Sequence, residues 1–130
     1  MSAFTVELDN HPGELARLCE AMASSGVNLL LCATTHGNRG VVAFLADDEA
    51  AAQAVLDGAG IEYLLRPAVT VRMANLPGAG AAAFRKLAEA GVNVEMLLPV
   101  RISDEEFFAV ICADDAATAE GTLGGQVISE

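Results

Sequence analysis

Apolar residues alternate with polar ones in two stretches of the chain, which is the period of a strand with one buried face. In the first stretch Phe4, Val6 and Leu8 are the apolar positions. Residues 69–73 repeat the same alternation with Val69, Val71 and Met73. Each stretch therefore predicts an opening β-strand.

Helical spacing follows each of these strands. Apolar side chains at i, i+3, i+4 and i+7 are typical of a helix with one buried face. In the first stretch these positions hold Leu15, Leu18, Cys19 and Met22. In the second they hold Gly80, Ala83, Phe84 and Leu87. Gly26 and Gly91 are expected to end the two helices, because glycine readily adopts the left-handed conformation of a C-terminal cap.

The remaining pattern predicts two further strands, a second helix and a last strand in each half. The strands are expected at residues 29–33 and 41–46 around a turn at 36–40, and at 94–100 and 107–112 around a turn at 103–106. Acidic residues at 47–49 and 114–115 favour helix starts, since the helix dipole stabilises negative charge there. A last strand is expected at 61–65, whereas only 126–129 remains in the second half, so that strand is predicted to be short or missing.

Two motifs recur 65 residues apart. Asn10-His11-Pro12-Gly13 and Gly26-Val27-Asn28 correspond to Asn75-Leu76-Pro77-Gly78 and Gly91-Val92-Asn93. A repeat in fixed register indicates two copies of one βαββαβ unit, at residues 1–67 and 68–130. Only residues 66–68 separate the copies, so we expect them to pack side by side in one continuous sheet.

These motifs and this element order resemble the ACT domain family. The resemblance covers nearly the whole chain as a tandem pair. It implies an α+β fold of two ferredoxin-like units packed in tandem, each an antiparallel sheet with helices on one face. It also implies a regulatory protein that binds an amino acid at an interface between units and acts in amino-acid metabolism.

By motif position, the resemblance also implies a set of ligand-binding residues. In the first copy these are Asn10, His11, Pro12, Gly13, Glu14, Leu15, Asn28 and Leu29. In the second copy they are Asn75, Leu76, Pro77, Gly78 and Asn93. The loop residues 11–15 and 76–80 would supply backbone amides.

The chemistry of these residues suits an amino acid. Unpaired amides at a helix N-terminus favour a carboxylate. An asparagine both donates and accepts without adding charge, so one at the loop and one at the next strand would hold both ends of a zwitterion. Alternatively, Asn10 and Asn75 cap their helices, and Asn28 and Asn93 occupy tight turns. The first loop is the more polar, which favours the first copy as the binding one.

Composition and charge limit the partners. The chain has 130 residues and a net charge of −11, which repels nucleic acids and anionic membranes. No apolar run is long enough to cross a membrane, and the start of the chain does not read as a signal peptide. We therefore expect a cytoplasmic protein.

Catalytic, metal-binding and cofactor-binding patterns are not evident. His11 and His36 are expected to be exposed loop residues, and the acidic clusters to be solvated. Cys19, Cys32 and Cys112 lack metal-like spacing, and we expect buried, reduced thiols. The sequence therefore predicts no enzyme activity, no metal and no cofactor.

Two functional hypotheses remain. The first is an amino-acid sensor. The second is a regulatory subunit that acts mainly through contact with an amino-acid biosynthetic enzyme, as the small subunit of acetolactate synthase does. Either needs a partner, because a chain without an effector domain cannot transmit occupancy alone. A homodimer is also expected, since a truncated last strand leaves a sheet edge uncovered.

Overall fold

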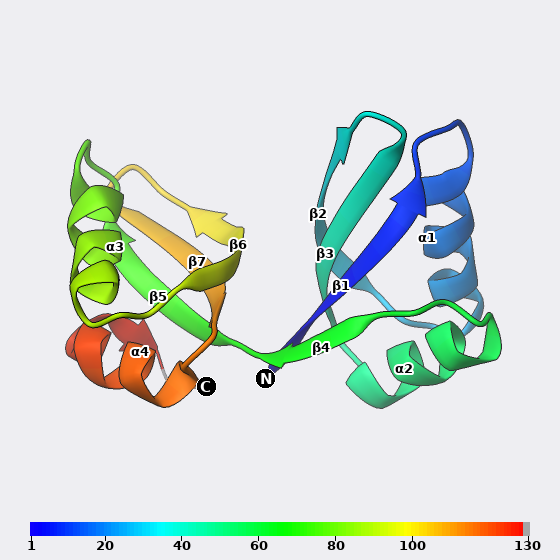
Figure 1. Ribbon diagram of the computed structural model, residues 1–130. Coiled ribbons are helices and arrows are strands. Elements are labelled where there is room, and N and C mark those ends of the chain that lie inside the picture. Colours follow the sequence, from blue (N-terminus) through cyan, green and yellow to red (C-terminus); the bar gives the residue numbers. More distant parts are fainter. Residues whose placement is uncertain (129–130) are drawn as a thin grey trace. The chain divides into compact units, whose positions relative to one another are not determined.

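The computed structural model describes residues 1–128, and its contacts divide the chain into two compact units (Figure 1). The N-terminal unit is Ser2–Arg66, and the C-terminal unit starts at Pro67 and includes Met1. Met1 belongs with the C-terminal unit, where its carbonyl accepts a hydrogen bond of 3.0 Å from the Ala68 amide.

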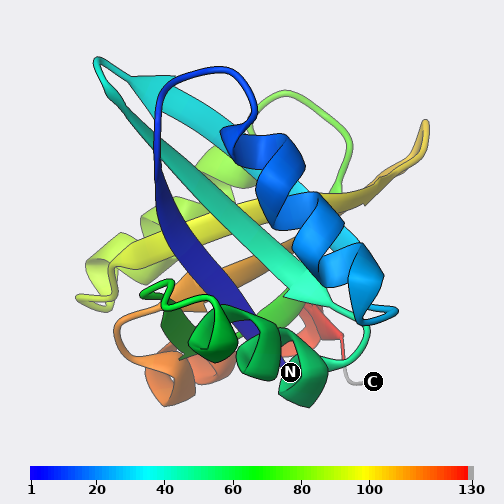
Figure 2. The ribbon, with the colours of Figure 1, turned by 90° about the vertical axis from the view of Figure 1, so that its right-hand side faces the viewer.

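The N-terminal unit has one antiparallel sheet covered on one face by two helices (Figures 1 and 2). Its elements are β1 (Ser2–Asp9), α1 (Glu14–Ser24), β2 (Leu29–His36), β3 (Arg39–Ala46), α2 (Glu49–Gly58) and β4 (Leu64–Pro67). The strand order is β2-β3-β1-β4.

The C-terminal unit repeats this architecture. Its elements are β5 (Val69–Ala74), α3 (Ala79–Glu89), β6 (Val94–Ile102), β7 (Glu106–Ala113), α4 (Ala116–Leu123), a 3-10 turn (Gly124–Gln126) and β8 (Val127–Ile128). The strand order β6-β7-β5-β8 matches that of the first unit. The predicted tandem βαββαβ fold is confirmed, and β8 is short as expected. Ser129, part of the predicted last strand, lies outside the described residues.

Two expectations about the strands are wrong. The described strands form two four-stranded sheets rather than one continuous sheet. Only Ala68 separates β4 from β5, and one residue cannot form the hairpin that would pair these two strands. In addition, the last strand of the first unit is β4, whereas residues 61–63 are irregular. Ile61 and Tyr63 pack against the core of their unit, and this contact explains their apolar alternation without a strand.

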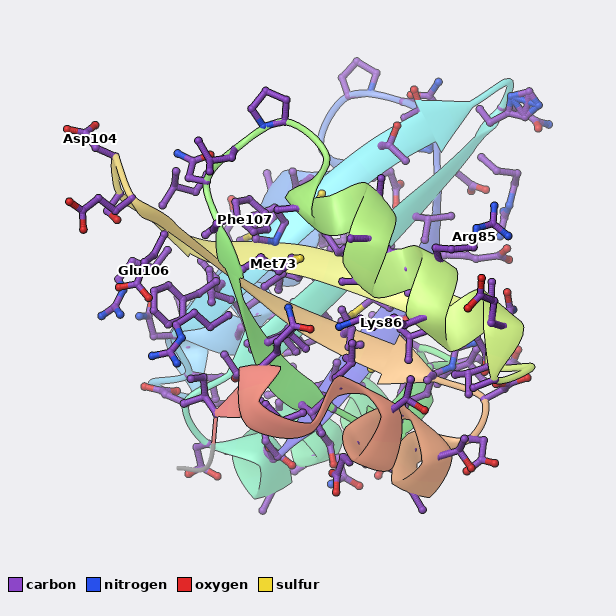
Figure 3. The ribbon with its side chains drawn as sticks, turned by 90° about the vertical axis from the view of Figure 1, so that its left-hand side faces the viewer. Met73, Arg85, Lys86, Asp104, Glu106 and Phe107 are labelled. Carbon is purple, nitrogen blue, oxygen red and sulfur yellow. The ribbon has the colours of Figure 1, made fainter. Side chains whose placement is uncertain are left out.

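Each core lies between a sheet and its two helices. In the N-terminal unit the register places Phe4 opposite Phe44, and their rings stack with centroids 4.9 Å apart. Leu18 and Met22 of α1 and Leu56 of α2 complete this cluster. The equivalent C-terminal cluster contains Val71, Met73, Leu87 and Ile111, and Figure 3 shows Met73 and Phe107 close to α3.

The helix-ending glycines have the predicted conformation. Gly26 has a φ of 72° and Gly91 a φ of 75°, both in the left-handed region. The amide of Gly26 donates to Ala23 O at 2.9 Å, and that of Val27 donates to Met22 O at 3.0 Å. These bonds satisfy carbonyls at the end of α1 and direct the chain toward β2.

The expectation of three buried thiols is wrong for Cys32. Cys112 is buried and Cys19 is partly buried, but Cys32 is exposed. Leu29 and Leu31 of β2 pack against the core, so Cys32 points to the sheet face that the helices of its unit leave uncovered. Alternation along the strand therefore decides the exposure of this thiol.

The conformation of Gly26 gives a stability prediction. Gly26→Ala should lower the free energy of unfolding of the N-terminal unit by roughly 1–2 kcal/mol, because an L side chain is strained at this φ. Gly58→Ala is the matched control: this glycine is helical with no heavy atom within 4 Å of the added Cβ. It should raise stability by about 0.5–1 kcal/mol. Urea unfolding measures both changes, and equal effects would contradict the assignment of Gly26.

Candidate functional site

The asparagine of each Asn-x-Pro-Gly loop holds a hairpin. Asn10 Nδ2 donates to Gly37 O at 2.8 Å, and the Asn10 amide donates to Asn38 O at 2.9 Å. Asn75 repeats the arrangement, with Nδ2 donating to Ser103 O at 2.7 Å. Gly13 and Gly78 occupy the helix caps, and neither helix has a side-chain cap. The interpretation of these asparagines as helix caps is therefore wrong.

The second asparagine of each copy is held through its backbone. The Asn28 amide donates to Asp47 Oδ1 at 2.9 Å, and Asn28 O accepts from the Asp47 amide at 3.1 Å. Asn93 and Asp114 form the same pair of bonds. Among the described residues only glycines have positive φ, so the tight turn is made by the preceding glycine. The exposed side chain of Asn28 has no role in that turn.

The two asparagines of one copy lie far apart. Asn10 bonds to the hairpin just before β3 begins, whereas Asn28 bonds to Asp47, just after β3 ends. The eight residues of β3 separate these points by about 25 Å at the strand rise of roughly 3.3 Å per residue. Asn10 and Asn28 of one unit therefore cannot hold both ends of one amino acid.

The other expected ligand residues lie mostly in exposed loops. His11 Nε2 lies 3.0 Å from Glu14 Oε1, which also pairs with Arg17 Nη1 at 3.0 Å. Pro12, Gly13 and Leu15 are exposed, and Leu29 packs against the core. In the second copy Leu76, Pro77 and Gly78 are exposed, and Leu76 is 69% accessible. His36, like His11, is exposed as expected.

A groove of about 790 Å³ in the N-terminal unit brings charged and apolar side chains together. Its lining residues on β1 are Thr5, Glu7, Leu8 and Asp9, and on α1 they are Glu14, Arg17, Leu18 and Ala21. Arg39 and Val41 of β3 and residues Ala59, Ile61, Glu62, Tyr63 and Leu64 complete it. Of the residues expected from the sequence, only Glu14 lines this groove.

The charged lining residues are arranged in ion pairs. Arg39 lies 2.7 Å from Asp9 and 3.1 Å from Glu7, and Arg17 pairs with Glu14. The side chains around Arg39 are about half exposed or more, and exposed pairs of this kind contribute only about 0–1 kcal/mol each. A ligand carboxylate or ammonium can therefore replace one member of a pair at little energetic cost.

Tyr63 gives the groove an aromatic wall and an optical reporter. It is the only tyrosine of a chain that has no tryptophan. Its ring lies 5.8 Å from that of Phe4, and its hydroxyl donates to Gln53 Oε1 at 3.4 Å. Desolvation, followed by the nearby Asp57 carboxylate, raises the pKa of Tyr63 above its ordinary value of 10.0.

Sequence reasoning missed most of this groove. The alternation along the first strand puts Glu7, and by extension Asp9, on the face opposite the core, and Arg39 lies within the turn expected at 36–40. These signals indicate that Arg39 lies opposite Asp9 once the β1–β3 register is known. The groove exists because residues 61–63 do not pair with β1. The alternation of apolar and polar residues in the sequence gives no sign of this.

The C-terminal unit does not repeat the groove's charges. Asp9 corresponds to Ala74, Glu14 to Ala79 and Arg17 to Ala82. The cross-strand pair is kept with its charges exchanged: Arg72 on β5 lies 3.5 Å from Glu106 on β7. Figure 3 shows Asp104 and Glu106 well apart from Arg85 of α3. The charged lining of this groove is thus particular to the N-terminal unit.

Other kinds of site find less support. Among residues 1–128, no group of three or more histidine, cysteine or acidic side chains is placed to hold a metal ion. No helix in this part of the chain is long and apolar enough to cross a membrane.

Comparisons with known proteins support the fold. No family model matches the chain, and no curated protein matches its sequence. A protein from Bacteroides thetaiotaomicron has a similar structure, with a TM-score of 0.82 and 21% identity over 98% of this chain and 90% of that chain. The regulatory subunit of aspartate kinase from Thermus thermophilus, in a ligand-free form, has a TM-score of 0.67 and 24% identity, over 94% of this chain and 86% of that chain. The regulatory subunit of aspartate kinase from Thermus flavus has a TM-score of 0.68 and 23% identity, over 94% of this chain and 88% of that chain.

The hydrogen bonds of the two asparagines predict unequal effects on stability. Asn10→Ala should lower the free energy of unfolding by about 1 kcal/mol, because Gly37 O loses its donor. Asn28→Ala keeps both backbone bonds and should change stability by less than about 0.5 kcal/mol. Chemical denaturation of the two variants measures this difference, and a larger loss for Asn28→Ala would contradict it.

The environment of Tyr63 predicts its titration. Tyrosinate absorbance should rise with a midpoint above 10.0, and Asp57→Asn should lower that midpoint only in part, since desolvation is the larger cause. A raised pKa means that the folded state favours the protonated phenol. The stability linked to Tyr63 is therefore complete below its ordinary pKa and is lost as the pH rises through the raised value. An ordinary midpoint in the folded protein would show that Tyr63 is fully solvated.

Proposed function

We propose that this chain is a non-catalytic regulatory protein that binds an amino acid in the groove of its N-terminal unit. The observation that carries the proposal is the presence of both charges around an apolar strip in one groove. Arg17 and Arg39 are partners for a carboxylate, and Glu7 and Asp9 are partners for an ammonium. Leu18, Ala21 and Ile61 supply apolar contacts for a side chain.

Glu14 links this groove to the loop that the ACT resemblance implies. Its side chain is only 16% exposed and accepts contacts from both His11 and Arg17. A ligand carboxylate that engages Arg17 would compete with Glu14 and so alter the start of α1. Binding at the groove would in this way change the Asn-x-Pro-Gly loop without direct contact with Asn10.

The fold supports a regulatory role. It is shared with solved structures of regulatory subunits of aspartate kinase. We infer that the partner is an enzyme of amino-acid metabolism, because a small binding protein transmits occupancy only through a second molecule. The two hypotheses thus combine: the protein senses an amino acid and passes the signal on by contact with an enzyme.

A panel of the twenty amino acids tests this function. A ligand at 100 times its dissociation constant should add about 2.7 kcal/mol to the stability of the native state. The same ligand should change the fluorescence of Tyr63, the only tyrosine of the chain, which lines the groove. Arg17→Gln should weaken binding about tenfold, as expected for the loss of one charged hydrogen bond.

Arg85→Gln is the matched control, since it removes the same charge from a helix of the other unit. It should leave the affinity unchanged. A thermal shift without any change in Tyr63 fluorescence would place binding outside the groove. No shift with any amino acid would contradict the proposed function itself.

A further inference from the structure

The groove follows an uncovered sheet edge. β1 has eight residues, from Ser2 to Asp9, but its outer neighbour β4 has only four. Arg66 of β4 reaches Thr5, where Nη1 lies 3.4 Å from Oγ1. Beyond that point residues 61–63 are irregular, so β4 does not cover Glu7, Leu8 and Asp9.

The backbone of this uncovered part faces the groove. The Asn10 amide donates to Asn38 O, and in antiparallel sheets the residues that bond to one neighbour alternate along the strand. Leu8 and Val6 therefore bond to β3, whereas the amides of Glu7 and Asp9 point to the opposite edge. The Asp9 carbonyl accepts from the His11 amide at 3.1 Å, so the amides of Glu7 and Asp9 are the groups that make this edge a template for an added strand.

The two sides of this edge differ in chemistry. Glu7 and Asp9 lie on the sheet face away from the helices, with Arg39 between them. The other side carries Leu18 and Ala21 of α1 together with Ile61. An added strand would place alternate side chains on these two sides, so its sequence should alternate between basic and apolar residues.

Charge and size favour a basic segment of several residues. The lining holds four carboxylates, from Glu7, Asp9, Glu14 and Glu62, against the two guanidinium groups of Arg17 and Arg39. The groove thus keeps a net charge of −2 even when every arginine is paired. Its volume of about 790 Å³ suits a drug-sized ligand, which is larger than one amino acid.

We propose that an extended, basic segment of the partner protein docks in this groove by adding a strand to the uncovered edge of β1. The inference rests on the proposed function, because the amino acid and the segment share Glu7, Asp9 and the walls of the groove. Their binding is therefore competitive, and the amino acid releases the partner. Competition of this kind transmits occupancy directly, in addition to any change at the start of α1.

A second copy of the chain is a poorer occupant. Antiparallel pairing of two β1 edges would bring Glu7 and Asp9 of one copy against the same carboxylates of the other. Like charges in directly opposed positions are destabilising. This geometry favours a basic partner over a β1-to-β1 dimer.

Binding of short labelled peptides to the full chain tests the proposal by fluorescence anisotropy at low salt. An acetylated peptide of alternating lysine and valine should bind, and one of alternating glutamate and valine should bind at least tenfold more weakly. Two further peptides carry N-methyl groups on alternate residues, one on the odd positions and one on the even positions. In one of them the methyl groups replace the amide hydrogens that face β1, and this peptide should not bind. In the other the methyl groups lie on the far side, and this peptide should still bind.

Substitutions in the protein identify the groove. Glu7→Gln and Asp9→Asn should each weaken the lysine-valine peptide several-fold, whereas the control Glu20→Gln, on α1 but outside the lining, should not. Far-UV circular dichroism of each variant confirms folding. In a titration of the complex, an amino acid found in the panel should displace the peptide.

The outcomes separate the two proposals. Equal binding of both N-methylated peptides would indicate charge attraction alone and overturn strand addition. No peptide binding, with an amino acid still bound, would overturn the docking site and leave the proposed function intact. Peptide binding without an amino-acid ligand would contradict the proposed function and the competition but retain the docking site. Light scattering that shows a dimer, strengthened when Glu7→Gln removes one of the opposed carboxylates, would assign the edge to a second copy and overturn the proposal.

Discussion

The antiparallel pairing of the first and third strands is the constraint on which each unit depends. In the N-terminal unit this register sets Phe4 on Phe44 and Asp9 beside Arg39. It thereby decides which side chains form the core and which charges meet at the surface. The same pairing directs the amides of Glu7 and Asp9 toward the open edge of β1. The asparagine side chains of the two loops reinforce this register by holding the hairpin at the end of each pair.

Much of the fold follows from local patterns that the sequence displays. The alternation of Phe4, Val6 and Leu8 predicts a strand, and Gly26 predicts the end of a helix. Both predictions need only the residue itself and its near neighbours in the sequence. The fixed repeat then predicts that the two halves share one topology. The position of β4 could not be predicted, because Ile61 and Tyr63 alternate like a strand while their contacts are with the core. Alternating burial is the same in a paired strand and in an irregular segment that packs on the core, so the pattern does not distinguish them.

The candidate site was predicted less well than the fold. Motif position drew attention to Asn10 and Asn28, and the structure gives a side-chain reason for Asn10, whose Nδ2 holds the hairpin, whereas Asn28 is held through its backbone at the other end of β3. The groove arises from side chains that are distant in sequence, such as Arg17, Arg39 and Tyr63. Their convergence depends on the length of a neighbouring strand, and no short motif encodes it. Repetition in a sequence therefore marks structural necessity at least as strongly as ligand contact.

The exchange of charges between the two copies has a consequence for folding. A duplicated chain can mispair, with a strand of one copy entering the sheet of the other, and such errors are common in repeat proteins. Here β1 paired with β7 in the same register would place Asp9 opposite Glu106, and β5 paired with β3 would place Arg72 diagonally beside Arg39. Both wrong pairings bring like charges together, whereas both native pairings join opposite ones. The inverted ion pair thus favours pairing between strands of the same copy over pairing between strands of different copies.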